Sequence, residues 1–272
     1  MKPDHDIKSG MLSIRERKMT GQDKINILGA HINPLSPAET LELMMQWIKD
    51  RERHYICVCA VHIIMECLHN HHLQQMVNQA SLAVPDGMPL VWVSKLYGYR
   101  NVRRVYGPNL MLSFCELAAQ KNFTNFLLGG AVGQPEILAH NLTTRFPGLK
   151  IAGYNATPKR PIPEAENKKL IEEINACNPD VVWVGMGTPF QEYWVGANRS
   201  SLNAPILIGV GAAFDIHSKR VYQAPTWLQR LGLEWMFRLI QEPRRLWRRY
   251  LIGNPLFVWK LVCQWLGISK YK

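Results

Sequence analysis

Short apolar runs alternate with longer amphipathic stretches along the first four fifths of the chain. Runs of three to five residues rich in Val, Ile and Leu are typical of buried strands, and the stretches between them have helical spacing. Seven such runs lie at 25–28, 55–59, 82–84, 126–128, 151–154, 181–184 and 206–210. Strands and helices that alternate on this scale build a mostly parallel sheet with helices on both faces. The pattern therefore predicts an α/β fold.

Two of the predicted helices have clear start signals. Ser36 followed by Pro37 predicts a helix that runs to about Asp50, and Pro163 begins another whose charged residues form a solvated face. Ligands of parallel sheets bind beyond the carboxyl ends of the strands. The loops that follow the apolar runs are therefore the places to look for a site.

The loops after the second and third runs each carry one chemically useful side chain. His62 follows the run 55–59, where a histidine could donate a hydrogen bond, act as a base or simply belong to a helix start. Asp86 follows Pro85 and precedes Gly87, at a predicted strand end. Such an aspartate is a candidate general base. Asp-Gly is also a common turn former, so this alternative stays open.

Glycines follow three later runs, the last of them in a turn, Gly209-Val210-Gly211, that leads to Asp215. Gly129-Gly130 could present backbone N–H groups to a phosphate, although the spacing matches neither the dinucleotide fingerprint nor a P-loop, and a plain turn also needs glycine. Gly185 and Gly187 allow close backbone approach, and Gln191 then opens a helix. A glutamine amide both donates and accepts, which suits the edge of a base or a sugar.

Positive charge is concentrated at the C-terminal end. The chain has 32 Lys and Arg against 21 Asp and Glu, a net charge of +11. Residues 219–272 carry eleven of these cations and two acids, so +9 lies in the last fifth of the chain, together with five of the nine tryptophans. A surplus of this size indicates an anionic partner, such as a phosphorylated ligand, an anionic membrane or nucleic acid.

Cysteine usage and the N-terminus argue for a cytosolic protein. Six scattered cysteines are too few for a disulfide scaffold, and Cys57 and Cys59 have no second cysteine pair at the spacing of a zinc site. We therefore expect buried free thiols and no metal site. The first residues lack the apolar segment of a secretory signal, and no apolar run is long enough to span a bilayer.

The motifs PDG, LLGG, GMGTPFQE, GVGAAFD and APTWLQRLGLEWMFRLIQEPRRLWRR occur in this order. The set closely resembles the WecG/TagA/CpsF family of bacterial glycosyltransferases, over about residues 25–249. The resemblance implies a Rossmann-like α/β core with a basic helical C-terminal appendage. It also implies an inverting, metal-independent enzyme without a cofactor. Such an enzyme moves a sugar (N-acetylmannosamine-type, glucose or uronic acid) from a UDP-sugar to a polyprenyl-diphosphate-linked saccharide, in the synthesis of teichoic acid, common antigen or exopolysaccharide.

The resemblance also implies roles for individual residues. Asp86 matches the general base, which must take the proton of a weakly nucleophilic acceptor hydroxyl. Gln191 matches a loop glutamine near the nucleotide-sugar. Arg238, Arg245 and Arg248 match arginines that reach the UDP diphosphate, where they can replace a metal ion. Further substrate contacts are implied for His62 and Asn109, which depart from the commonest family residues, and for Gly130, Gly185 and Gly187.

We expect three segments: a flexible tail at 1–22, the glycosyltransferase core at 23–215, and the basic amphipathic appendage at 216–272. Pro243 interrupts the helical pattern of the appendage and predicts two helices or a kink. Arginines interleaved with tryptophans favour binding to the anionic inner face of the cell membrane. A helix docked on the core is the second interpretation, and single-stranded nucleic acid is a distant third.

Two other function classes share part of this pattern. A nicotinamide-dependent oxidoreductase would have the α/β core, but the fingerprint glycines are missing and the basic appendage would be unexplained. A non-catalytic membrane-docking protein would explain the appendage but not the loops. The sequence leaves the oligomeric state open, including a homo-oligomer.

Overall fold

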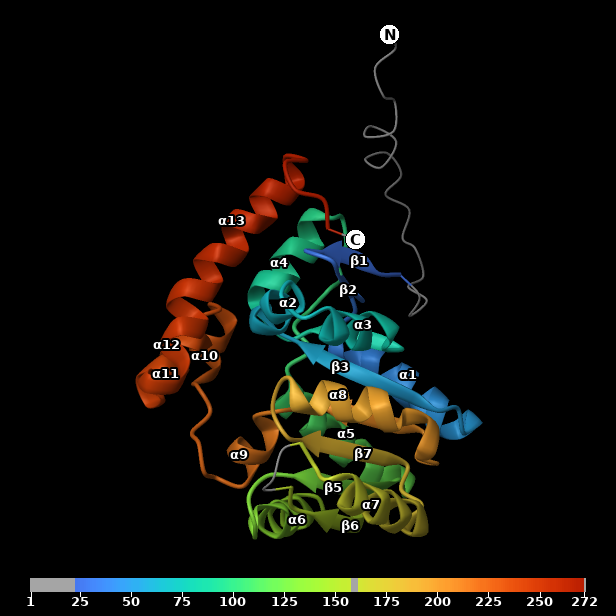
Figure 1. Cartoon of the computed structure of the whole chain (residues 1–272). Helices are drawn as coiled ribbons and strands as arrows, with labels where there is room; N and C mark the ends of the chain where they lie inside the picture. Colours follow the sequence, from blue (N-terminus) through green and yellow to red (C-terminus); the bar gives the residue numbers. More distant parts are fainter. Residues whose placement is uncertain (1–22, 158–160, 272) are drawn as a thin grey trace.

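The computed structural model describes residues 23–157 and 161–271, so the predicted tail at 1–22 lies outside the described residues. A six-stranded parallel sheet with the order β4-β3-β8-β7-β5-β6 forms the centre (Figure 1). Its strands are β3 (His54–Cys59), β4 (Leu82–Pro85), β5 (Thr124–Gly129), β6 (Lys150–Asn155), β7 (Val181–Gly185) and β8 (Ile206–Gly209). A separate antiparallel hairpin pairs β1 (Ile25–Ile27) with β2 (Ala30–Ile32). All seven predicted strands are confirmed, and β2 is additional.

Helices cover both faces of the sheet, as predicted for an α/β fold. On β3, Cys57 and Cys59 face one apolar cluster and Ile56 and Val58 face the other, because successive side chains alternate. Both thiols are buried and free, as expected. The first cluster includes side chains of α2 (Val61–Cys67), α3 (His71–Gln79), α4 (Met88–Leu96), α7 (Glu164–Cys177) and α8 (Phe190–Asn198). The second includes α1 (Pro37–Asp50), α5 (Gly107–Lys121), α6 (Gln134–Arg145) and α9 (Ala213–His217). A single 3₁₀ turn, Arg199–Ser201, follows α8.

Local sequence explains where α1 begins. The Ser36 hydroxyl accepts a hydrogen bond from the Glu39 backbone N–H, and the Glu39 carboxylate accepts one from the Ser36 backbone N–H at 2.7 Å. This reciprocal cap satisfies donors that the first turn leaves unpaired. The helix then buries Met44 and Ile48. The predicted start and end of this helix are both confirmed.

The strand order brings loops from distant parts of the sequence to one edge of the sheet. The chain adds β4 on one side of β3, while β8 and β7 lie on the other side. A crevice forms outside the carboxyl ends where the winding changes direction in this way. The loops after β3, β4, β5, β7 and β8 all meet there, and they are the loops that the sequence singled out.

The appendage is helical and broken where Pro243 predicts. Its helices are α10 (Thr226–Arg230), α11 (Glu234–Gln241), α12 (Pro243–Trp247) and α13 (Gly253–Trp265), with a π-helical segment, Arg248–Ile252, before α13. Figure 1 shows these elements along one side of the sheet. The appendage thus runs beside the carboxyl-end crevice.

The inner side of α13 packs on the core. Phe257 and Leu261 are buried in the same apolar cluster as α2, and the Gln264 side chain accepts a hydrogen bond from the Leu28 backbone N–H at 3.0 Å. The outer side leaves Trp259 65% exposed. The docked-helix interpretation therefore holds for one side of α13. Within the described ranges, no helix combines the length and apolar character needed to cross a bilayer.

Candidate active site

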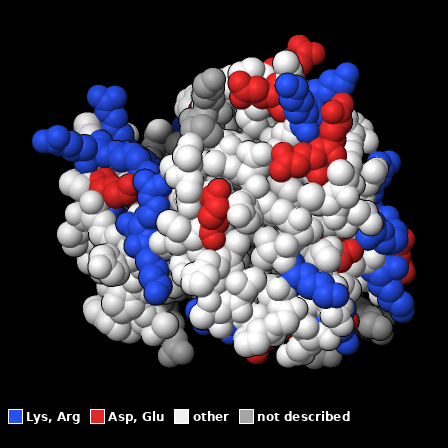
Figure 2. All heavy atoms as spheres, turned by 90° about the horizontal axis from the view of Figure 1, so that it is seen from below, with Lys and Arg blue, Asp and Glu red and all other residues white. Residues whose placement is uncertain are grey.

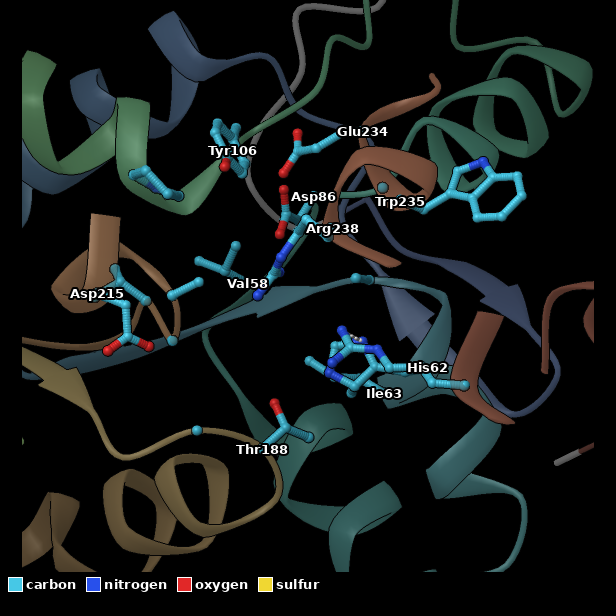
Figure 3. A pocket seen from close by; sticks show the side chains of 18 of the residues that line it. Val58, His62, Ile63, Asp86, Tyr106, Thr188, Asp215, Glu234, Trp235 and Arg238 are labelled. Atoms are coloured by element: carbon cyan, nitrogen blue, oxygen red, sulfur yellow. Dashed lines mark hydrogen bonds between the residues drawn. The ribbon is translucent and has the colours of Figure 1, made fainter. Parts of the chain in front are cut away.

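A cleft of about 750 Å³ lies between the carboxyl ends of the sheet and the appendage (Figure 3). Loops after five strands form one wall, and α11, α12 and the π-helical segment form the other. Eight of the ten predicted site residues line this cleft: His62, Asp86, Gly130, Gly185, Gly187, Gln191, Arg238 and Arg245. The sheet edge chosen from the sequence is therefore the edge that carries the cleft.

Asp86 stands directly after β4, where its backbone N–H donates to the Cys59 carbonyl at 2.7 Å. Its carboxylate is 23% exposed, and its Oδ1 accepts from Arg104 Nε at 3.3 Å and from Nη2 at 3.2 Å. Burial raises the pKa of Asp86 to about 6, against the lowering effect of Arg104, and the nearby Glu234 raises it further. A carboxylate with a pKa near neutrality can accept and release a proton under physiological conditions.

Arg104 links Asp86 to the appendage. Its Nη1 donates to Glu234 Oε2 at 2.6 Å, and its guanidinium carbon lies 4.0 Å from the centre of the Tyr106 ring. Figure 3 shows the carboxylates of Asp86 and Glu234 turned toward each other. Sequence reasoning missed Arg104 and Glu234, because neither forms a local motif with Asp86.

Four arginines of the appendage line the cleft: Arg220, and, from its helical part, Arg238, Arg245 and Arg249. Arg249 donates to Nδ1 of His62. Burial, followed by the charges of Arg249 and Arg238, lowers the pKa of His62 well below its usual value. His62 is therefore neutral, and its Nδ1 serves as an acceptor for Arg249. The site thus gathers positive charge without a charged histidine.

Two predicted residues do not line the cleft. Arg248 is exposed, and its guanidinium carbon lies 5.2 Å from the centre of the Trp247 ring. Asn109 is exposed on α5 and accepts a hydrogen bond from the Gln223 side chain at 3.2 Å. The neighbouring Arg249 takes the place expected for Arg248. Arg248 and Arg249 are three and four residues from Arg245, so helical spacing alone does not distinguish between them.

Gln191 ties two of the glycine loops together. Its Oε1 accepts from the backbone N–H groups of Gly187 at 3.2 Å and Gly211 at 3.0 Å, and its Nε2 donates to Glu192 at 2.9 Å. The Gly130 N–H likewise donates to the Gly185 carbonyl at 3.1 Å. These amides already have acceptors within the protein. These three N–H groups therefore stabilise the loops themselves.

A second polar group lines the cleft beside the Gly130 loop. The Gln134 side chain donates to Asp215 at 2.9 Å and accepts from Arg220 at 3.0 Å. All three residues line the cleft, and Arg220 belongs to the appendage. Sequence reasoning placed Asp215 in a glycine turn but gave none of the three a role. Across the described residues, no group of three or more His, Cys, Asp or Glu could hold a metal ion.

Comparisons with known proteins gave matches over most of the chain. A family model described as "Glycosyl transferase WecG/TagA/CpsF family" matches residues 25–271. The chain is 32% identical over 204 residues to the N-acetylglucosaminyldiphosphoundecaprenol N-acetyl-beta-D-mannosaminyltransferase of Bacillus spizizenii, which covers 75% of this chain and 77% of that protein. It is 24% identical over 263 residues to the enzyme of the same name from Staphylococcus aureus, covering 96% of this chain and 100% of that protein.

Proposed function

Because the chain belongs to the WecG/TagA/CpsF family of glycosyl transferases, we propose that its cleft moves a sugar from a UDP-sugar to a polyprenyl-diphosphate-linked saccharide. The product would serve the synthesis of a bacterial cell-surface polysaccharide. The observation that carries the proposal is the pairing, in one cleft, of a near-neutral carboxylate, Asp86, with three arginines. The names of the relatives favour N-acetylmannosamine over glucose or a uronic acid as the sugar transferred.

We assign Asp86 as the general base. The acceptor hydroxyl attacks the anomeric carbon of the donor while Asp86 takes its proton, and the bond between that carbon and the UDP diphosphate breaks. One displacement of this kind inverts the anomeric configuration. Because Oδ1 of Asp86 accepts hydrogen bonds from Arg104, we assign Oδ2 as the atom that takes the proton of the acceptor hydroxyl. A pKa of about 6 leaves the carboxylate ionised at neutral pH and still basic enough to react.

Arg238, Arg245 and Arg249 neutralise the departing diphosphate in this proposal. Charge-assisted hydrogen bonds from guanidinium groups to phosphate oxygens are strong and directional. Positive charge fixed at the place where negative charge develops lowers the barrier most, since no reorganisation is needed. The mechanism therefore needs no divalent cation. We keep Arg248 and Asn109 outside the set of substrate contacts.

The appendage also offers a surface for an anionic membrane. Figure 2 shows Lys and Arg gathered over the lobe that the appendage forms. Exposed apolar side chains of α13 lie beside those of α4, since the Trp265 indole N–H donates to the Tyr97 hydroxyl at 3.2 Å. Basic residues next to exposed tryptophans suit the interface of an anionic bilayer. We propose that the protein works on the cytoplasmic face of the membrane, where a lipid-linked acceptor would be found.

Transfer of radiolabelled sugar from a panel of UDP-sugars to synthetic N-acetylglucosaminyl-diphospho-polyprenol tests the proposal. We expect transfer from UDP-N-acetylmannosamine, and calorimetric binding of UDP but not of NAD. Binding of NAD without UDP would favour the oxidoreductase. Binding to anionic liposomes without transfer from any donor would favour the non-catalytic alternative.

A further inference from the structure

Glu234, the first residue of α11, connects the appendage to the base through Arg104. Its carboxylate lies 2.6 Å from Arg104 Nη1, and the same guanidinium holds Asp86 Oδ1 at 3.2 Å through Nη2. The side chains of Glu234, Arg104 and Asp86 are only 10%, 17% and 23% exposed. One largely buried cation therefore serves two carboxylates that come from different parts of the fold.

The other groups around Asp86 are cationic or neutral. Burial raises the pKa values of Cys59 and Tyr106, so both remain uncharged at neutral pH. Arg238 of α11 and Arg249 of the π-helical segment add positive charge. The titratable and charged groups that interact with Asp86 are Cys59 from β3, Arg104 and Tyr106 from the segment before α5, Glu234 and Arg238 from α11, and Arg249. Among these groups, Glu234 is the carboxylic acid.

We propose that Glu234 is a positioning residue that turns Asp86 into an effective base only when the appendage is docked, by sharing Arg104 with it. This inference rests on the function proposed above. The appendage then serves two parts of the reaction, because α11 carries both Arg238, which faces the leaving group, and Glu234, which positions the base. A cleft without its appendage would hold an Asp86 that pairs with Arg104 alone.

The direction of the effect follows from electrostatics. A carboxylate paired with a guanidinium of its own is stabilised in its charged form, which lowers its pKa and weakens it as a base. A second carboxylate on the same guanidinium opposes that stabilisation, and the docked appendage also buries Asp86. Both effects raise the pKa of Asp86: burial raises it to about 6, and Glu234 adds to the rise.

The test compares Glu234→Gln with Glu242→Gln in the full-length protein. Gln keeps an oxygen that can accept from Arg104 but removes the charge. Glu242 is a matched control, because it is an acid of the same appendage that pairs with Arg245 at 2.6 Å rather than with Arg104. The readouts are the pH dependence of kcat/KM for sugar transfer and, without any substrate, titration of Asp86 by carbon NMR of aspartate carboxyl groups.

We expect Glu234→Gln to move the Asp86 titration and the acid limb of the rate profile down by about one pH unit, the usual effect of one charge at this range. Glu242→Gln should leave the Asp86 titration and the acid limb unchanged. Glu234→Asp keeps the charge, so both should stay close to their wild-type positions. An unmoved titration in a Glu234→Gln protein with the wild-type melting temperature would overturn the inference. If the wild-type protein transfers no sugar, the proposed function fails, while the NMR titration still decides whether Glu234 sets the pKa of Asp86.

Discussion

Arg248 and Arg249 provide a sharp test of how the cleft handles charge, because they are adjacent in sequence and identical in chemistry. Arg249 lines the cleft and donates to His62, whereas Arg248 is exposed and lies against the Trp247 ring. Arg249→Ala should therefore impair sugar transfer strongly, and Arg248→Ala should impair it little. Both changes remove the same charge from the appendage, so their effects on net charge cancel in the comparison.

The size of the difference follows from where each charge lies. Removing one fixed donor from a developing negative charge costs roughly 10²–10³ in kcat, or about 2.7–4 kcal/mol. Arg238 and Arg245 remain in Arg249→Ala, so we expect a loss near the lower limit, about 100-fold. Arg248→Ala removes an exposed cation–π contact of about 0.5–1 kcal/mol, and kcat should stay within about threefold of wild type.

Single-turnover transfer with saturating donor measures this difference, and liposome co-sedimentation measured on the same proteins controls for membrane binding. Arg249→Lys should recover part of the lost rate, because the charge returns without the planar guanidinium. Equal losses in Arg248→Ala and Arg249→Ala would refute the placement of the diphosphate against Arg249. Losses of transfer that follow losses of liposome binding would assign both arginines to the membrane.

Three further predictions follow from the same geometry. Transfer should survive excess EDTA in a metal-free buffer, because arginines neutralise the leaving diphosphate; loss of transfer that Mg²⁺ or Mn²⁺ restores would contradict this. The kcat/KM for transfer should fall about tenfold per pH unit below pH 6 and level off above it. Burial raises the pKa of Asp86 to about 6, and protonation below that pH removes the base. A flat profile between pH 5 and 7 would exclude this role. Trp259→Ser should weaken co-sedimentation with anionic liposomes but spare transfer to a water-soluble acceptor, because this side chain is 65% exposed and is not among the residues that line the cleft; unchanged co-sedimentation would show that α13 does not face the lipid.

The sheet and one edge of the site could be predicted because both depend on local pattern. Alternation places Cys57 and Cys59 on one face of β3, and Asp86 stands between the end of β4 at Pro85 and the start of α4 after Gly87. The short hairpin strand β2 escaped prediction, since the polar His31 separates Ala30 from Ile32 and leaves no apolar run there.

The electrostatic partners of the base could not be predicted in the same way. Arg104 is 18 residues from Asp86 and 130 from Glu234, and only the folded chain brings the three together. Glu234 is one of two acids in a strongly basic segment, and nothing in its local sequence indicates a role near Asp86. The π-helical segment that begins at Arg248 adds a local change in helical phase that residue spacing does not reveal. Composition located the cationic region, but geometry was needed to identify which arginines enter the cleft.

The role of Asp86 is the central claim, and the Asp86→Asn variant tests it most directly. Asn keeps the size of the side chain and a carbonyl oxygen for Arg104, while Glu234 continues to pair with that arginine. The measurement is the single-turnover rate of sugar transfer at about pH 7.5, where Asp86 is ionised, with UDP affinity determined by calorimetry on the same protein. We expect unchanged UDP affinity and a rate reduced by roughly 100-fold or more, the usual contribution of a general base. A rate close to that of the wild type would show that Asp86 is only a turn residue and that another group takes the proton.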